Sequence, residues 1–312
     1  MKLLGTFFRL IRYPNLLFIL FTQYLMQYAV LIPVFRSYGL HPTLGNGMFF
    51  LLSFSTILVA AAGYIINDYF DINIDLVNRP TRIIVDRLIS RRWAIFWHTV
   101  FNIVAVVLGF VVAIREGSWL AGLVQPVCTG LLWFYSTSYK RQLMTGNLVI
   151  ALMTSLTVLV VGIYEPQLFH PGGGQDAIAA RRVFHILGVY AVFAFLISMI
   201  REIVKDMEDM PGDAKNGCRT IPIAWGISPA KKLCYWMVGL LILVIGGVQF
   251  RLGEWGWFSD MAYLVLAVEL PLFFMAVKLR RAVSSKDLHQ ISTLIKGIMG
   301  AGICSMFFFL IR

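Results

Sequence analysis

The fold is decided by the stretch Asn67–Arg82, NDYFDINIDLVNRPTR, and by the segment 48–66, MFFLLSFSTILVAAAGYII, which it directly follows. The segment 48–66 carries no charge and is long enough to cross much of the roughly 30 Å of membrane hydrocarbon as a helix. Asp68, Asp71 and Asp75 therefore stand at the end of a membrane-length helix.

The rest of the chain has the same apolar character. Of its 312 residues, 59% are hydrophobic and only 14% are charged, and the mean hydropathy is +0.76. Soluble domains carry about a quarter charged residues, and a compact domain of this size cannot bury so many helices that are apolar all round. We therefore expect an all-α, polytopic membrane protein with about nine transmembrane helices. These spans are predicted near 15–35, 47–66, 93–114, 118–137, 146–164, 183–203, 233–250, 257–279 and 290–311.

The basic residues orient the predicted helices. With the N-terminus in the cytoplasm, the cytoplasmic side carries 20 of the 27 Lys and Arg, counting Arg201 and Lys278 at helix ends, and the outer side carries six. This asymmetry fits the positive-inside rule. It accounts for the net charge of +11 without a nucleic-acid partner, and it favours anionic membrane lipids. We expect an integral, multi-pass protein of a bacterial or archaeal cytoplasmic membrane, beginning with a short interfacial helix within 1–14.

Most acidic residues fall in two predicted cytoplasmic loops, one after the second span and one after the sixth. In the first loop, Asp68, Asp71 and Asp75 share one face if the helix continues past Asn67, which lies on the adjoining stripe. Like charges stacked in this way repel one another unless a cation lies among them. Carboxylate and amide oxygens suit Mg²⁺ that bridges a phosphate.

The second loop repeats this chemistry. Asp209 and Asp213 flank a Met-Pro-Gly sequence, which is expected to break the helix so that a turn places the two carboxylates. Asp206 precedes them by one helical turn, and Arg201 and Lys205 supply positive charge close by.

Two such clusters facing one cavity would hold a Mg²⁺ ion on each side of a diphosphate. Neutralising the diphosphate would make it a better leaving group, and an apolar cavity would receive a long lipid tail. Arg79 and Arg82 follow the first cluster at once and would hold phosphate oxygens that the metal leaves free.

Some polar residues in the predicted spans have a structural interpretation. Glu269 and Lys296 are expected to form a buried pair rather than to contact substrate, and His98 is expected to be a packing residue. The four cysteines have no metal-binding or disulfide spacing and are interpreted as apolar fillers. Close helix packing is expected at Gly297, Gly300 and Gly302.

Two other classes of protein have to be weighed. A secondary transporter would be expected to carry broken helices and ionisable residues near the middle of the membrane, whereas this chain keeps most of its acids at one mouth of the bundle. A membrane scaffold without chemistry would leave both acidic clusters unexplained. An enzyme that acts on a lipid diphosphate accounts for them.

The motifs of this chain resemble those of the UbiA superfamily of intramembrane prenyltransferases. The first loop matches its pattern at Asn67, Asp68, Asp71 and Asp75, followed by Asn78, Arg79 and Pro80. The second loop matches at Asp209, Asp213, Gly217, Arg219 and Thr220. Further matches are Arg12 and Asn15, Tyr135, Ser136 and Lys140, and Gly146 and Asn147. The resemblance covers nearly the whole chain and implies that residues 1–312 form a single transmembrane prenyltransferase domain.

The resemblance implies a helical bundle around a central cavity that is open to lipid, with Mg²⁺ as the cofactor. The donor would be an isoprenyl diphosphate, which ionises so that its allylic cation alkylates a membrane acceptor. The catalytic and metal-holding residues would be Asn67, Asp68, Asp71, Asp75, Asp209 and Asp213. The substrate-binding residues would be Arg12, Asn15, Arg79, Arg82, Tyr135, Lys140, Asn147, Arg201, Lys205 and Asp206. Among these, Arg12 and Lys140 would contact diphosphate oxygens.

The acceptor is indicated by the second loop. The sequence REIVKDMEDMPGDAKNGCRTIPI, 201–223, is most similar to the branch that prenylates geranylgeranylglyceryl phosphate in lipid biosynthesis, and Lys205, Lys215 or Arg219 would then meet the acceptor's phosphate. The first loop departs from the family, because NRPTRIIVDRLIS lacks a second Pro and a Gly. A quinone precursor of the 4-hydroxybenzoate, dihydroxynaphthoate or homogentisate type therefore stays open as the acceptor. No protein partner is predicted.

Overall fold

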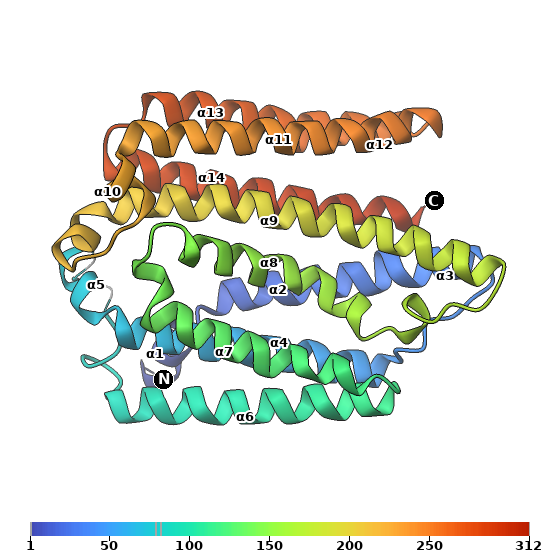
Figure 1. Cartoon of the computed structure of the whole chain (residues 1–312), viewed down its shortest axis with the longest axis horizontal. Helices are drawn as coiled ribbons and strands as arrows, with labels where there is room; N and C mark the ends of the chain where they lie inside the picture. Colours follow the sequence, from blue (N-terminus) through green and yellow to red (C-terminus); the bar gives the residue numbers. More distant parts are fainter. Residues whose placement is uncertain (1, 79, 82, 312) are drawn as a thin grey trace. The chain divides into compact units, whose positions relative to one another are not determined.

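The computed structural model describes residues 2–78, 80–81 and 83–311 and is almost entirely helical (Figure 1). Apart from a bridge between Val85 and Ile89, these residues form no β pairing. The α-helices are α1 (Lys2–Leu10), α2 (Tyr13–Leu25), α3 (Ile32–Ser37), α4 (Asn46–Phe70), α5 (Ile72–Asn78), α6 (Arg91–Arg115), α7 (Val124–Thr137), α8 (Thr145–Ile163), α9 (Gln175–Lys215), α10 (Ile221–Trp225), α11 (Ile227–Glu254), α12 (Phe258–Leu264), α13 (Leu270–Arg281) and α14 (Ser285–Cys304). The π-helical segments are η1 (Met26–Leu31) and η5 (Val265–Glu269), and the 3₁₀ segments are η2 (Trp119–Leu123), η3 (Tyr139–Arg141), η4 (Pro166–Leu168) and η6 (Ser305–Leu310).

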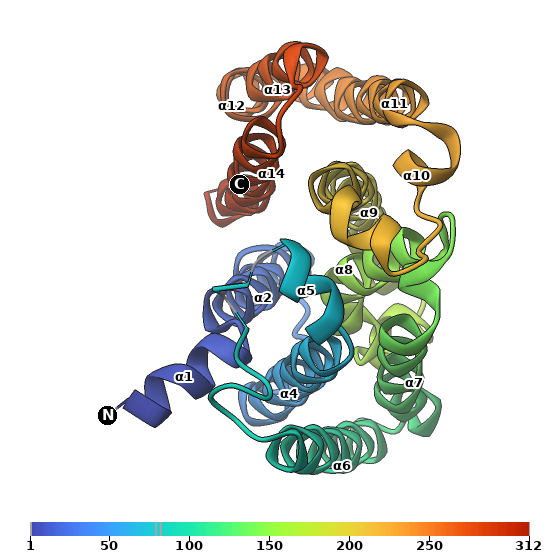
Figure 2. The same cartoon turned by 90° about the vertical axis from the view of Figure 1, so that its left-hand side faces the viewer.

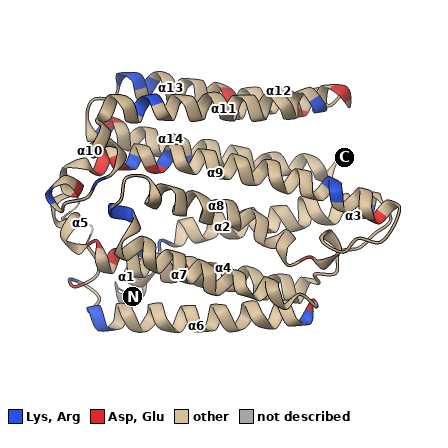
Figure 3. Cartoon of the chain, viewed as in Figure 1, with Lys and Arg blue, Asp and Glu red and all other residues tan. Residues whose placement is uncertain are grey.

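Within the described residues, eight helical segments are long and apolar enough to cross a membrane. They are Tyr13–Ser37, Asn46–Phe70, Arg91–Arg115, Thr145–Ile163, Gln175–Lys215, Ile227–Glu254, Phe258–Arg281 and Ser285–Leu310. Each of them overlaps one predicted span, so the prediction of an all-α, polytopic membrane protein is confirmed. Charged residues gather at the ends of the helices, whose middle turns carry few of them (Figure 3).

The span predicted at 118–137 is shorter than expected. Only α7 is α-helical there, with 14 residues, and the preceding residues form the 3₁₀ segment η2. Pro126 has no N–H, and its ring crowds the carbonyl of the residue four positions before it. A proline is therefore tolerated in the first turn of an α-helix, which is where α7 places Pro126.

Two of the spans that contain an interior proline have a π-helical segment directly before it. The segment η1 directly precedes the turn with Pro33, and η5 directly precedes the turn with Pro271. Inside a membrane, a carbonyl that loses its helical donor must be satisfied locally, and a wider π turn is one way to do so. Both spans thereby remain continuous.

Helix α9 runs for 41 residues, far beyond the predicted span 183–203. The expected break at Met-Pro-Gly is wrong, because Pro211 lies inside the helix. Proline has the φ angle of a helix and removes one hydrogen bond. On the preceding turn, the buried residues Met207 and Glu208 anchor the helix, which explains why it continues.

The chain divides into two compact units. The first unit comprises Met1–Lys140 and Thr157–His185, and the second comprises Arg141–Leu156 and Ile186–Arg312. In the first unit, α4 packs against α2, α6 and α7 (Figure 2). Each unit carries one of the two acidic motifs, the first at the end of α4 and the second at the end of α9.

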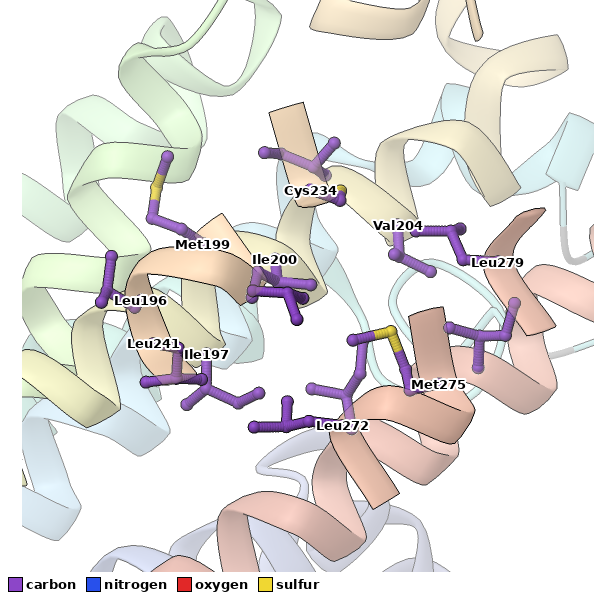
Figure 4. Close-up of a cluster of buried hydrophobic side chains, with 14 of the residues drawn as sticks. Leu196, Ile197, Met199, Ile200, Val204, Cys234, Leu241, Leu272, Met275 and Leu279 are labelled. Carbon is purple, nitrogen blue, oxygen red and sulfur yellow. The ribbon is translucent and has the colours of Figure 1, made fainter. Parts of the chain in front are cut away.

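The core of the second unit is formed by apolar side chains of α9, α11, α13 and α14. Figure 4 shows Ile197 and Ile200 of α9 beside Leu241 of α11 and Leu272 of α13. Helix α14 approaches α9 closely at one glycine, since a Cβ added at Gly302 would lie 2.5 Å from Cε1 of Phe193.

Close packing is thus confirmed at Gly302 only. A Cβ at Gly297 would meet no described atom within 4 Å, so the expectation for Gly297 is wrong, and Gly300 stays a prediction.

The remaining polar residues of the spans have mixed outcomes. Glu269 Oε2 accepts a hydrogen bond from Gln249 Nε2 at 3.0 Å. Glu269 is partly buried and Lys296 is exposed, so the expected burial of both charges is wrong, while their pairing stays a prediction. His98 is buried, with Nδ1 3.0 Å from the carbonyl oxygen of Ala62, which confirms its packing role. All four cysteines are free, and three of them are buried.

Candidate functional site

The first acidic motif lies where α4 ends and α5 begins. Asn67 and Asp68 belong to the last turn of α4, which ends at Phe70. Asp71 caps this helix with φ −89° and ψ 0°, and its N–H donates to the main-chain carbonyl of Asn67 at 2.9 Å. The continuous helix that the spacing predicts is therefore interrupted at Asp71. The N–H of Asp75 still bonds the carbonyl of Asp71 at 2.8 Å, so the chain keeps a helical turn across the interruption.

Asp68 is paired with a cation from the start of the first span. Arg12 Nη2 donates to Asp68 Oδ1 at 2.7 Å, and the guanidinium lies 5.1 Å from the centre of the Tyr64 ring. Arg12 has a left-handed backbone, with φ 52°, at the N-cap of α2, where Pro14 occupies the first turn. This turn between α1 and α2 aims the arginine at the end of α4.

Asp71 accepts one hydrogen bond on each carboxylate oxygen. Lys140 Nζ pairs with Oδ1, and Asn67 Nδ2 donates to Oδ2 at 2.7 Å. The side chains of Lys140 and Asp71 are only 8% and 17% exposed. A charge at this depth needs a partner, and Lys140 supplies it from η3, immediately after α7.

The first motif fits a magnesium ion in its chemistry. Asn67 Oδ1 is buried and has no hydrogen-bond partner among the described residues, although it is a good oxygen ligand. In the described part of the chain, no three His, Cys, Asp or Glu side chains are grouped so that they would hold a metal by themselves. Mg²⁺ is usually held by one or two carboxylates, water and substrate phosphates rather than by a full protein cage, so the donor set is compatible with the ion.

The second acidic motif lies on one continuous helix. Asp206, Asp209 and Asp213 of α9 are spaced by three and four residues, as Asp68, Asp71 and Asp75 are in the first motif. This spacing puts the three residues on one face of α9. A helix rather than the predicted turn therefore places these carboxylates.

Asp206 is held by an amide of a neighbouring helix. Asn147 Nδ2, at the start of α8, donates to Asp206 Oδ2 at 2.8 Å, and Asn147 is 6% exposed. The predicted substrate-binding residues Asn147 and Asp206 are thus brought together, although they are 59 positions apart in the sequence.

The glycine after the second motif ends α9. Gly217 has φ +72°, the N–H of Cys218 donates to Asp213 at 3.0 Å, and the N–H of Gly217 donates to Ala214 at 3.2 Å. These two bonds form a Schellman motif, which favours glycine at its left-handed position. The chain then turns so that the N–H of Arg219 donates to the carbonyl of Arg141 at 2.8 Å.

One carboxylate near the second motif was not singled out from the sequence. Glu202 accepts from Arg201 Nη1 at 2.7 Å and from Lys205 Nζ at 3.2 Å, and its side chain is 7% exposed. The signal is present in the sequence, because Glu202 stands next to Arg201 and three residues before Lys205. Both predicted substrate-binding cations are therefore tied to this glutamate.

Four other predicted site residues lie in the first half of the chain. Asn15 and Tyr135 are partly buried in the first unit, and the N–H of Asn15 donates to the carbonyl of Arg12 at 2.8 Å. Arg79 and Arg82 lie outside the described residues.

Comparison of the sequence with known proteins gives a consistent family. The model of the UbiA prenyltransferase family matches residues 26–294. A protein from Methanosarcina mazei named digeranylgeranylglyceryl phosphate synthase is 32% identical over 279 residues, which cover 87% of this chain and 86% of that protein. A protein of the same name from Methanosphaera stadtmanae is 28% identical over 246 residues, which cover 78% of this chain and 81% of that protein.

Solved structures share the fold. A UbiA homolog from Archaeoglobus fulgidus bound to DMAPP and Mg²⁺ has a TM-score of 0.62 and 19% identity, and the match covers 98% of this chain and 99% of that chain. A structure from work on digeranylgeranylglyceryl phosphate synthase in membranes has a TM-score of 0.66 and 22% identity over the full length of both chains. At these identities the likeness concerns the fold.

Proposed function

Because the chain belongs to the UbiA prenyltransferase family, we propose that it transfers a geranylgeranyl group from its diphosphate to the hydroxyl of geranylgeranylglyceryl phosphate. The new C–O bond forms at the allylic carbon, the bond from that carbon to the diphosphate breaks, and the hydroxyl proton leaves. The observation that carries this proposal is the first motif, in which Asn67, Asp68 and Asp71 gather with Arg12 and Lys140 at the end of an apolar span. The names of the relatives support the acceptor.

The acidic residues of both motifs would hold Mg²⁺, which, when bound, neutralises the diphosphate and makes it a better leaving group. The residues concerned are Asn67, Asp68, Asp71, Asp75, Asp209 and Asp213. Mg²⁺ in the Archaeoglobus fulgidus homolog supports this cofactor. Both motifs would serve the same donor molecule, so loss of either one should abolish the same step.

Arg12 and Lys140 would bind the diphosphate directly. Each of them is now paired with a carboxylate of the first motif, and each presents N–H donors at the end of α4. A guanidinium matches two phosphate oxygens at once, and an ammonium acts as a point charge. These two cations would orient the donor and stabilise the departing diphosphate.

The phosphate of the acceptor would meet cations that follow the second motif. Lys215 and Arg219 are exposed, and neither forms an ion pair among the described residues. Lys205 is instead bonded to Glu202 and is less available to a ligand. The contact of Arg219 with Arg141 through the backbone keeps two arginines in neighbouring segments, and guanidinium groups suit the phosphate of the proposed acceptor.

The test is a transfer assay with purified protein, radiolabelled geranylgeranyl diphosphate, and either geranylgeranylglyceryl phosphate or an aromatic quinone precursor as the acceptor, with and without Mg²⁺. We expect Mg²⁺-dependent product from the glyceryl phosphate acceptor. In an Arg219→Gln, Lys215→Gln variant, the KM for this acceptor should rise by about tenfold, in line with the loss of charged hydrogen bonds.

The matched control is Lys232→Gln, which removes an exposed lysine of α11. This control should leave the acceptor KM unchanged. If only an aromatic acceptor gives product, the proposed glyceryl phosphate acceptor is wrong. If the protein makes no prenylated product and instead transports a solute without diphosphate, the proposal that it is an enzyme is wrong.

The domain organisation and the orientation are part of this proposal. Residues 1–312 would act as one domain, and the match of the family to 26–294, which includes residues of both units, supports this. The N-terminus would lie in the cytoplasm of a bacterial or archaeal cell, and the excess of Lys and Arg on that side supports the orientation.

A further inference from the structure

The second motif lies on a turn of α9 that contains a proline. Pro211 lies between Asp209 and Asp213 and has no N–H, so the carbonyl of Met207 loses its helical donor. A proline within a helix costs about 3 kcal/mol relative to alanine. The carboxylates of the motif therefore stand on a turn that has one helical hydrogen bond fewer than a regular helix.

The start of α14 contacts α9 at this place. His289 Nδ1 lies 3.0 Å from Glu208 Oε1, and Ser285 Oγ donates to the main-chain carbonyl of Glu208 at 3.3 Å. Glu208 directly precedes Asp209, and its side chain is 8% exposed. One residue of α9 is thus held both by its side chain and by its backbone, immediately before the proline turn.

The contacting turn of α14 is itself well ordered by its cap. Ser284 and Asp287 form a capping box, in which the N–H of Asp287 donates to Ser284 Oγ at 3.2 Å and the N–H of Ser284 donates to Asp287 Oδ2 at 3.0 Å. Such a box satisfies two donors that a helix start leaves unpaired. Leu288 and Ile291 then anchor the same turns in the core of the second unit.

We propose that Ser285 and His289 are positioning residues for the prenyl transfer, which hold Asp209 and Asp213 in the arrangement that the donor diphosphate needs. Neither residue touches the substrate, and both act through Glu208. This inference rests on the proposed function of the second motif. It assigns a role in the reaction to α14, which carries neither motif.

Three measurements on full-length protein in detergent test the proposal. The first is amide hydrogen exchange, followed by mass spectrometry, of wild type and of a Ser285→Ala, His289→Ala variant. Exchange of the amides of 209–216 should rise by about tenfold or more, because hydrogen bonds to a charged group are lost, while amides in the middle of α9 keep their protection.

The second measurement is Mg²⁺-dependent binding of a non-reacting thiodiphosphate analogue of geranylgeranyl diphosphate. The Mg²⁺ concentration for half-maximal binding should rise by about tenfold, as it does when groups that orient metal ligands are removed. In the transfer assay, the KM for the donor should rise, while the KM for the acceptor and kcat at saturating donor and Mg²⁺ stay close to wild type.

His289→Gln is the conservative variant, because its amide can still donate to Glu208, and it should restore binding of the analogue. Gln290→Ala, at an exposed position next to His289, is the matched control and should change nothing. If the double variant loses only Vmax, and its Mg²⁺ requirement and its KM for the donor are unchanged, Ser285 and His289 have a merely structural role and the proposal is overturned. Unchanged amide exchange at 209–216 in the double variant would also overturn it. The proposed function fails separately, in wild type, if the analogue does not bind or no prenylated product forms.

Discussion

Asp71 is the carboxylate of the first motif that has both a cationic and an amide partner. Its two oxygens take one bond each from Lys140 and from Asn67, and it stands at the point where α4 gives way to α5. A nearly buried carboxylate that loses its charge or its partner changes the balance of the whole cluster. Asp71 is therefore the position where a change of charge without a change of shape is most informative.

We expect Asp71→Asn to lower kcat by about 100-fold or more, which is the usual effect of removing one group that stabilises charge in a transition state. Asparagine is isosteric and can still accept from Lys140 through its oxygen, so the variant should fold, with lower stability because Lys140 loses its counter-charge. Steady-state transfer rates and thermal unfolding in detergent check both statements.

The control for this change is Asp86→Asn. Asp86 forms an exposed ion pair with Arg91, worth at most about 1 kcal/mol, and its φ of 74° is one that asparagine tolerates. Equal losses of activity in the two variants would show that the effect of Asp71→Asn is not specific to the motif.

At the scale of the helices, prolines and glycines decide the details. Prolines are preceded by π segments in two spans, and Pro211 lies within the continuous helix α9. Glycine is required at Gly217 by a positive φ and at Gly302 by the approach of α14 to α9. The close approach at Gly302 can be tested by a compensating change of the neighbouring side chain, Phe193.

Gly302→Ala should destabilise the protein by about 1–3 kcal/mol, because its Cβ would lie 2.5 Å from Cε1 of Phe193 and the core is overpacked. Adding Phe193→Leu makes room and should recover most of this loss. Thermal unfolding of the single and double variants in detergent measures the effect.

Gly246→Ala in α11, where no described atom lies within 4 Å of the new Cβ, is the control and should be neutral or slightly stabilising. The packing argument is wrong if Phe193→Leu worsens the effect of Gly302→Ala.

At the scale of the whole molecule, the spans and the charged ends of the helices define a topology. The first motif follows Asn46–Phe70 and the second ends Gln175–Lys215, while the loop around residues 165–174 lies at the start of that same helix. If η2 and α7 cross the membrane as the predicted span 118–137, and the basic side faces the cytoplasm, both motifs face it too. The charged diphosphate headgroup would then reach both motifs from the cytoplasm.

Labelling of single cysteines in intact cells tests this orientation. Gly173→Cys should react with a membrane-impermeant maleimide from outside, whereas Ser90→Cys should react only after the cells are permeabilised. Both positions are exposed, and a Cβ at Gly173 has no described neighbour within 4 Å. Three of the four native cysteines are buried, so the background is low. The reverse pattern of labelling would place the N-terminus outside.

Much of the fold follows from local chemistry in the sequence. The spans are long apolar runs. Inside a membrane such a run must satisfy its backbone hydrogen bonds internally, so it forms a helix whatever its tertiary contacts are. The acidic motifs can also be recognised from the sequence, because carboxylates that are grouped at the end of an apolar run need cations. Boundaries were harder to predict, because Pro211 was expected to end a helix that continues to Lys215.

The sequence by itself therefore determined the class of the protein, its spans and the residue types of its two motifs, because hydrophobic length and charge spacing are properties of the chain. Only the tertiary structure decided which partners these residues have. Arg12 is 56 positions from Asp68, Lys140 is 69 from Asp71, and His289 is 81 from Glu208. Contacts between such distant residues depend on how the helices pack, and no local pattern along the chain encodes that packing.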